Sequence, residues 1–162
     1  DLVGVLERFE PPPGRSRILS LGKGVRLIDD TYNANPISMA NALQMLITAR
    51  SPGQQTYVVL GDMLELGEKE IDYHRHIGER IARLGIDNVL TFGPLSQYIE
   101  EGAQQKNKRL KVFWTLDKQE LIRELKRRLS SQGDAIILVK GSRGMRMEQV
   151  VEALRGNVGK EA

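Results

Sequence analysis

Short apolar runs alternate with amphipathic helical segments through most of this chain. Strand-sized runs lie at 25–28, 57–60, 88–92, 112–114 and 135–139, and each leads on to a segment with helical spacing of its apolar residues. This alternation predicts an α/β fold, with a mostly parallel sheet that carries helices on both faces. A further run at 17–21 and the run at 25–28 flank Gly22-Lys23-Gly24, which predicts an antiparallel edge hairpin. We therefore expect a Rossmann-like, six-stranded sheet.

Length and composition are those of one soluble domain. With 162 residues, of which 28% are charged and 40% hydrophobic, the chain is long enough for one core of helices packed on a sheet. No apolar run approaches a membrane span, we expect no secretory signal, and the absence of cysteine excludes disulfides and thiolate metal sites. The net charge of +3, with basic residues spread among 21 acidic ones, gives no reason to expect nucleic-acid binding.

Both ends of the chain have the character of boundary segments. The sequence begins with Asp1 rather than Met, which suggests a piece of a longer protein. The stretch Pro11-Pro12-Pro13-Gly14 is too stiff for a helix or a central strand. We therefore predict a linker and the remnant of a preceding domain at 1–14, one domain at 15–156, and a frayed tail at 157–162.

Two helix starts are marked by capping residues. Asn35-Pro36 combines a cap oxygen with proline at the first helical position, which predicts a helix from about 36 to 50. Asp117 and Glu120 have the spacing of a capping box before a helix with a stripe of leucine and isoleucine. Both helices should therefore begin directly after polar turns at the end of a strand.

The turn after the run at 25–28 gathers polar side chains at one strand-to-helix junction. They are two carboxylates, a phenol and two amides, from Asp29, Asp30, Tyr32, Asn33 and Asn35. Ligands bind at the carboxyl ends of strands in open α/β sheets, because helix N-termini point free N–H groups there. The alternative is an ordinary turn in which these side chains satisfy local backbone groups.

Two further loops leave strand ends and carry unusual polar residues. The segment 140–144, Lys-Gly-Ser-Arg-Gly, suits a phosphate or carboxylate, although a plain basic turn has the same composition. Asp62 and Glu65 lack any recognised metal-ligand spacing, so we predict no metal site. His74 lies on the inward face of the next helix, as a core residue or as a ligand contact, whereas His76 faces outward.

Three motifs, in order along the chain, resemble the C-terminal domain of the Mur ligase family. They are Asp-Asp-Thr-Tyr-Asn-Ala-Asn-Pro at 29–36, Leu-Gly-Asp-Met-Leu-Glu-Leu-Gly at 60–67 with His74 and Ile77-Gly78 after it, and Val-Lys-Gly-Ser-Arg-Gly-Met at 139–145. The resemblance covers nearly all of the chain from about Gly14. Gly93-Pro94-Leu95-Ser96 stands where the member that adds diaminopimelate has Asp-Asn-Pro-Arg, which favours the member that adds a dipeptide.

The resemblance implies a cytoplasmic, three-domain ligase of peptidoglycan synthesis. It would use ATP to join D-alanyl-D-alanine to UDP-N-acetylmuramoyl-tripeptide through an acyl phosphate. This chain would be the Rossmann-like domain that closes over an N-terminal domain and a central ATPase domain of the same protein. Magnesium would be held mainly by that central domain.

The resemblance also assigns residues. The adenine and ribose of the nucleotide would lie against Asp30, Tyr32, Asn33 and Asn35. The substrates would meet Lys140, Ser142, Arg143, Asp62 and His74, the first three facing the incoming dipeptide and the last two lining the cleft. The candidates for a catalytic role are Lys140, Arg143 and His74.

The chain lacks a P-loop of its own. The first glycine of that motif would fall at Arg17, and Gly24 replaces the required serine or threonine. We therefore expect no turnover by this chain alone. Two other functions stay open: a related amide ligase of the folylpolyglutamate or cyanophycin synthetase type, and a non-catalytic Rossmann-like binding module. The sequence also leaves open the third residue of the tripeptide, the oligomeric state, and whether the domains are open or closed.

Overall fold

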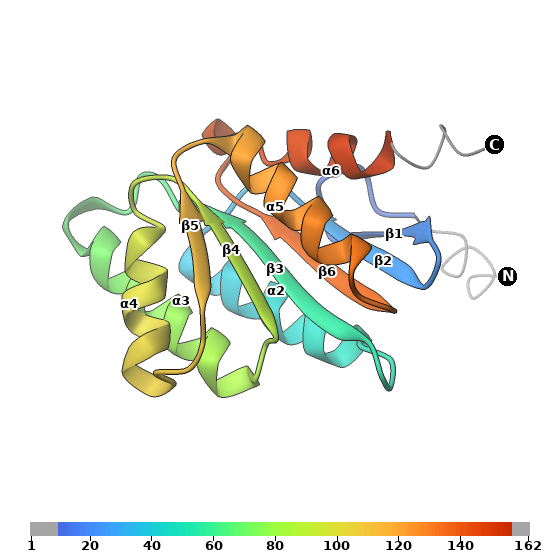
Figure 1. Cartoon of the computed structure of the whole chain (residues 1–162). Coiled ribbons are helices and arrows are strands. Elements are labelled where there is room, and N and C mark those ends of the chain that lie inside the picture. Colours follow the sequence, from blue (N-terminus) through green and yellow to red (C-terminus); the bar gives the residue numbers. More distant parts are fainter. Residues whose placement is uncertain (1–9, 157–162) are drawn as a thin grey trace, which may run out of the picture.

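A computed structural model describes residues 10–156 as a six-stranded sheet covered by helices (Figure 1). The strands are β1 (Arg17–Gly22), β2 (Val25–Asp30), β3 (Gln55–Gly61), β4 (Asn88–Phe92), β5 (Val112–Thr115) and β6 (Ala135–Lys140). The helices are α2 (Pro36–Ala49), α3 (Glu70–Leu84), α4 (Gln97–Lys106), α5 (Lys118–Ser130) and α6 (Glu148–Arg155), with short 3₁₀ turns η1 (Gly67–Lys69) and η2 (Arg143–Met145). The predicted tail and most of the predicted linker lie outside the described residues.

The strand order is β1-β2-β6-β3-β4-β5, with β1 antiparallel to β2 and every other neighbouring pair parallel. The predicted fold class is thereby confirmed, including the hairpin at one edge. β6, the last strand along the chain, lies between β2 and β3. The loops that follow these three strands therefore meet at one edge of the sheet, as the sequence predicts.

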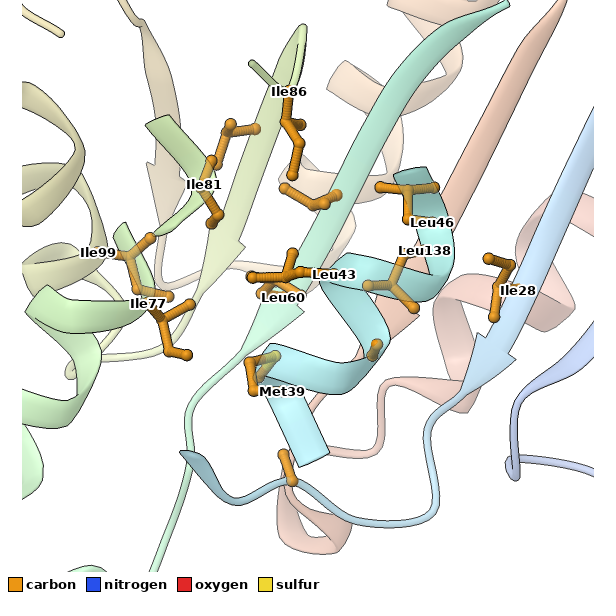
Figure 2. Close-up of a cluster of buried hydrophobic side chains, with 14 of the residues drawn as sticks. Ile28, Met39, Leu43, Leu46, Leu60, Ile77, Ile81, Ile86, Ile99 and Leu138 are labelled. Atoms are coloured by element: carbon orange, nitrogen blue, oxygen red, sulfur yellow. The ribbon is translucent and has the colours of Figure 1, made fainter. Parts of the chain in front are cut away.

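The sheet separates two hydrophobic cores because successive strand residues point to opposite faces. Ile136 and Leu138 of β6 pack in the core beneath α2, α3 and α4, whereas Ile137 and Val139 pack in the core beneath α5 and α6 (Figure 1). In the first core, Figure 2 shows Met39, Leu43 and Leu46 of α2 lying against the sheet residues Ile28, Leu60 and Leu138. Each such side chain stabilises the fold by about 1.5–3 kcal/mol through burial.

Both predicted helix starts are confirmed in position. The Asn35 side chain accepts a hydrogen bond from the Ser38 N–H (2.8 Å), and the Ser38 hydroxyl lies 3.0 Å from the Asn35 N–H, which it accepts. Asp117 caps α5, but Glu120 bonds the Thr115 hydroxyl instead of the Asp117 backbone. Thr115 itself takes the Asp117 N–H (3.0 Å), so the predicted capping box is formed on one side only.

None of the helices in residues 10–156 is both long and apolar enough to cross a membrane. The helices are amphipathic instead, and they turn their apolar stripes to the sheet, as in α5, where Leu121, Ile122 and Leu125 are buried.

Candidate functional site

A groove of about 400 Å³ lies beside the loop that follows β2. Its walls come from that loop, from the first turns of α2, from the segment before β1 and from the end of β6. The four residues predicted to contact a nucleotide all line it, namely Asp30, Tyr32, Asn33 and Asn35, and Lys140 lines it as well. The sequence reasoning thus locates the groove, but it does not identify Arg15, Ser16, Asn41 or Met45 in its walls.

Lys140 is buried, and its charge is paired inside the protein. Its side chain is 3% exposed, and its ammonium donates to the Asp30 carboxylate (2.6 Å) and to the Asn33 carbonyl (2.8 Å). Because an ammonium has three donors, one remains for a group in the groove. Lys140 therefore fixes the loop after β2 and can make one further contact.

The segment just before β1 is bonded to the same loop. The Gly14 N–H donates to Asp29 (3.0 Å), and the Gly14 carbonyl accepts the Tyr32 N–H (2.9 Å). A Cβ on Gly14 would lie 3.1 Å from the Tyr32 nitrogen, and its φ of +79° favours glycine. This contact brings the Arg15 guanidinium to 4.3 Å from the centre of the Tyr32 ring. The sequence did not predict this contact, because the prolines before Gly14 indicate a linker.

Ser142 joins all three loops. Its hydroxyl accepts the Leu64 N–H (2.8 Å) and lies 3.3 Å from the Ala34 carbonyl, to which it donates. Its own N–H donates to the carbonyl of Asp62 (3.0 Å). The side chain is therefore buried, its one hydrogen is donated within the protein, and it does not line the groove.

Asp62 is buried and serves the turn before α4. Its carboxylate accepts the N–H groups of Leu95 (3.1 Å) and Ser96 (2.7 Å), and the Ser96 hydroxyl (2.6 Å). Gly93 is required beside it, because a Cβ there would lie 2.5 Å from the carboxylate. Asp62 thus ties the loop after β3 to the loop after β4, and it does not line the groove.

His74 holds the loop after β3 from below. Its Nδ1 lies 2.6 Å from the Glu70 carbonyl, which only accepts, and its Nε2 accepts the Met63 N–H (3.0 Å). These partners assign the neutral tautomer with the hydrogen on Nδ1. His74 is completely buried and His76 is exposed, as the helical phase predicts. Its position agrees with the core alternative that the sequence left open.

Arg143 has an open side chain at the end of the loop after β6. It is 69% exposed, and its guanidinium lies 6.0 Å from the centre of the Tyr32 ring. Its nearest acidic partner in the described residues is Glu148, at 3.9 Å. Arg143 can therefore meet an anion at the rim of the groove with two parallel hydrogen bonds.

The described residues contain no group of three acidic or histidine side chains that could hold a metal ion. The groove presents amides, a phenol, a hydroxyl and the Asp30 carboxylate, which is paired with Lys140, and the cations Arg15 and Arg143 lie beside the Tyr32 ring. Such groups bind and orient a ligand that has an aromatic ring and negative charge.

Comparisons with known proteins agree with this architecture. Residues 14–143 match the family model described as Mur ligase, glutamate ligase domain. The UDP-N-acetylmuramoyl-tripeptide–D-alanyl-D-alanine ligase of Bacillus subtilis is 38% identical over 140 residues, which are 86% of this chain and 30% of that protein. The corresponding ligase of Escherichia coli is 40% identical over 152 residues, which are 94% of this chain and 32% of that protein.

Solved structures give the same result. The crystal structure of MurF ligase from Thermotoga maritima in complex with ADP is 30% identical, with a TM-score of 0.76, over 96% of this chain and 33% of that one. A MurF structure from Acinetobacter baumannii is 31% identical, with a TM-score of 0.82, over the same shares of each chain. The chain spans about a third of the length of these relatives. It belongs to the Mur ligase family, within which it matches the glutamate ligase domain.

Proposed function

We propose that this chain is the C-terminal, nucleotide- and substrate-contacting domain of an ATP-dependent ligase that joins D-alanyl-D-alanine to UDP-N-acetylmuramoyl-tripeptide. The observation that carries the proposal is the groove and its arginine rim on three interlocked loops, in a domain shared with ligases of that name. The domain would comprise residues 15–156, with Gly14 as its first contact.

In this reaction the tripeptide carboxylate takes the γ-phosphoryl group of ATP, which gives an acyl phosphate and ADP. The dipeptide amine then attacks the acyl carbon, the C–O bond to phosphate breaks, and the amine loses a proton as the amide forms. This domain would bind and orient the nucleotide and the acceptor. The P-loop and magnesium would belong to the central domain, and this chain alone would not turn over.

The groove fits the nucleoside part of ATP. The Tyr32 side chain is half exposed, which leaves an aromatic surface for adenine. The amide oxygens of Asn33 and Asn35 accept backbone N–H groups, so their NH₂ groups stay free to donate to ring nitrogens or ribose oxygens. Lys140 keeps one donor, and Arg15 adds a positive charge at the same wall.

The acceptor would be read at the rim of the groove by Arg143, which would bind the carboxylate of D-alanyl-D-alanine. Ser142 would fix the backbone from which Arg143 projects, because its hydroxyl and N–H bond both neighbouring loops. Asp62 and His74 would act one layer further back, by holding the loop after β3 in place.

The remaining domains of the protein would cover this edge of the sheet. Three large apolar side chains are exposed there: Ile37 (75%), Leu116 (62%) and Leu64 (38%). They stand at the start of α2, after β5 and after β3, all at the edge of the sheet that carries the site loops. Apolar side chains gathered around a polar site are typical of a surface that meets another domain. We place the whole enzyme in the cytoplasm with its soluble substrates.

The direct test is phosphate release from ATP by the full-length protein with UDP-muramoyl-tripeptide. D-alanyl-D-alanine, glutamate and no acceptor are compared. Release that depends on the dipeptide is the expected result. Release that depends on glutamate would move the protein to a sister ligase, and no release with any acceptor would favour a non-catalytic binding module.

A further inference from the structure

The loop that carries Arg143 is fastened to α5 and to the start of α6 by the Lys118 ammonium. The Lys118 ammonium donates to the Gln149 side chain (3.0 Å) and to the Arg146 carbonyl (3.3 Å), and it lies 5.0 Å from the centre of the Phe92 ring. Burial lowers the pKa of Lys118, and the Glu148 carboxylate opposes this effect. The first turn of α6, with Glu148, is thereby held close to the loop after β6 that carries Arg143.

The Glu148 carboxylate lies near the Arg143 guanidinium but makes no hydrogen bond to it. Its Oε1 lies 3.9 Å from the Arg143 guanidinium, which is the nearest cation to it. Its Oε2 is buried and has no hydrogen-bond partner among the described residues. A buried acceptor without a partner is costly, and such groups require an explanation from function or strain.

We propose that Glu148 is a positioning residue for acceptor recognition: its carboxylate orients the Arg143 guanidinium toward the carboxylate of the bound acceptor. This inference rests on the proposed function. An exposed arginine loses rotamer freedom when it grips a ligand, and a partner that orders it beforehand reduces that loss. Contact through one terminal nitrogen leaves the other N–H groups of the guanidinium for a second carboxylate. By ordering Arg143, Glu148 strengthens the preference of Arg143 for acceptors that end in a free carboxylate.

Glu148 also has a purely structural alternative role. A carboxylate in the first turn of a helix stabilises that helix through its dipole. If this were the only role of Glu148, replacing it would lower the stability of the protein, but the effect on activity would not depend on the charge of the acceptor. The test therefore needs an acceptor that lacks the carboxylate.

The experiment compares D-alanyl-D-alanine with D-alanyl-D-alaninamide in the full-length enzyme. For E148Q we expect the KM for the dipeptide to rise about threefold to fivefold, as for a partly exposed ion pair, with kcat little changed. The KM for the amide should stay unchanged, because that acceptor has no charge for Arg143 to bind. E148D should restore part of the difference, and E148Q should have no further effect in an R143Q background. E152Q, an exposed change one turn along α6, is the matched control.

Each outcome is decisive. Equal effects of E148Q on both acceptors, or no effect on either, would overturn the positioning role. If the unaltered enzyme does not prefer the dipeptide to its amide, Arg143 does not read the carboxylate, and the inference falls together with that assignment. If the enzyme shows no acceptor-dependent phosphate release at all, the proposed function itself has failed.

Discussion

Two sets of polar side chains lie at the same edge of the sheet and differ in what they have left to bind with. Tyr32, Asn33 and Asn35 face the groove and keep free donors or an open ring. Asp62, His74 and Ser142 are buried, and their side chains form hydrogen bonds within the protein that hold the neighbouring loops. Position at the edge thus identifies the neighbourhood of a site. Hydrogen-bond saturation then separates residues that can bind a ligand from residues that hold the loops.

Asp62→Ala should have the largest effect on stability. It removes a buried carboxylate and leaves the N–H groups of Leu95 and Ser96 without a partner, which should lower the free energy of unfolding by about 3 kcal/mol. Asn33→Ala, from the groove set, should change it by less than about 0.5 kcal/mol. Urea denaturation of both variants measures the contrast. Equal losses would remove the distinction between the two sets.

His74→Ala should rank second, lowering the free energy of unfolding by about 2 kcal/mol, because it removes a completely buried ring and leaves the Met63 N–H unpaired in a buried site. His76→Ala, on the exposed face of the same helix, is the matched control and should have no measurable effect. Nitrogen NMR of the His74 ring should show hydrogen on Nδ1 only. Hydrogen on Nε2 would contradict the assigned role.

Ser142→Ala should lower the free energy of unfolding by about 1–1.5 kcal/mol, because a hydroxyl that bridges two loops is lost without leaving a large cavity. The amide hydrogen of Leu64 should exchange about tenfold faster with solvent, because its acceptor is gone. Ser20→Ala on the exposed face of β1 is the control. Unchanged exchange at Leu64 would show that Ser142 does not hold this loop.

Glu124→Gln, at a surface ion pair far from the edge, should have the smallest effect, about 0.5 kcal/mol at neutral pH. Hydrogen bonds from Arg127, and then from Arg128, lower the pKa of Glu124 to about 2. Because the folded-state pKa lies below the usual value of 4.5, this contribution is present above that pH and is lost as the pH falls toward 2. Stability curves of both proteins should therefore converge in acid. A difference in stability between the two proteins that stays constant from neutral pH to acid would show that the ion pair is not its source.

The fold could be predicted because its signals are local. Alternating apolar runs give the strands and helices, and the position of β6 between β2 and β3 agrees with the expectation of a parallel sheet that collects three loops at one edge. The predicted capping box at Asp117 formed on one side only, because Thr115, two residues earlier, bonds both the Glu120 carboxylate and the Asp117 N–H.

The division of labour within the site could not be predicted. Asp62 and Asn33 are both polar residues shortly after a strand, and the hydrogen-bond partner of Asp62, Ser96, is far away in sequence, whereas the Asn33 side chain bonds its neighbour Ala34. Arg15 could not be predicted because the proline-rich stretch before it indicates a linker. Its place beside the Tyr32 ring depends on the contact of Gly14 with Tyr32, which forms only in the folded sheet.

The central claim is that the nucleotide occupies the groove and not the buried polar layer. The KM for ATP of full-length Tyr32→Ala tests it most directly. Loss of an aromatic contact with the base should raise that KM about tenfold, while the midpoint of unfolding falls only slightly, because the ring is half exposed and loses mainly its contact with Arg15. An unchanged KM for ATP would contradict the account and would place the nucleotide elsewhere on the protein.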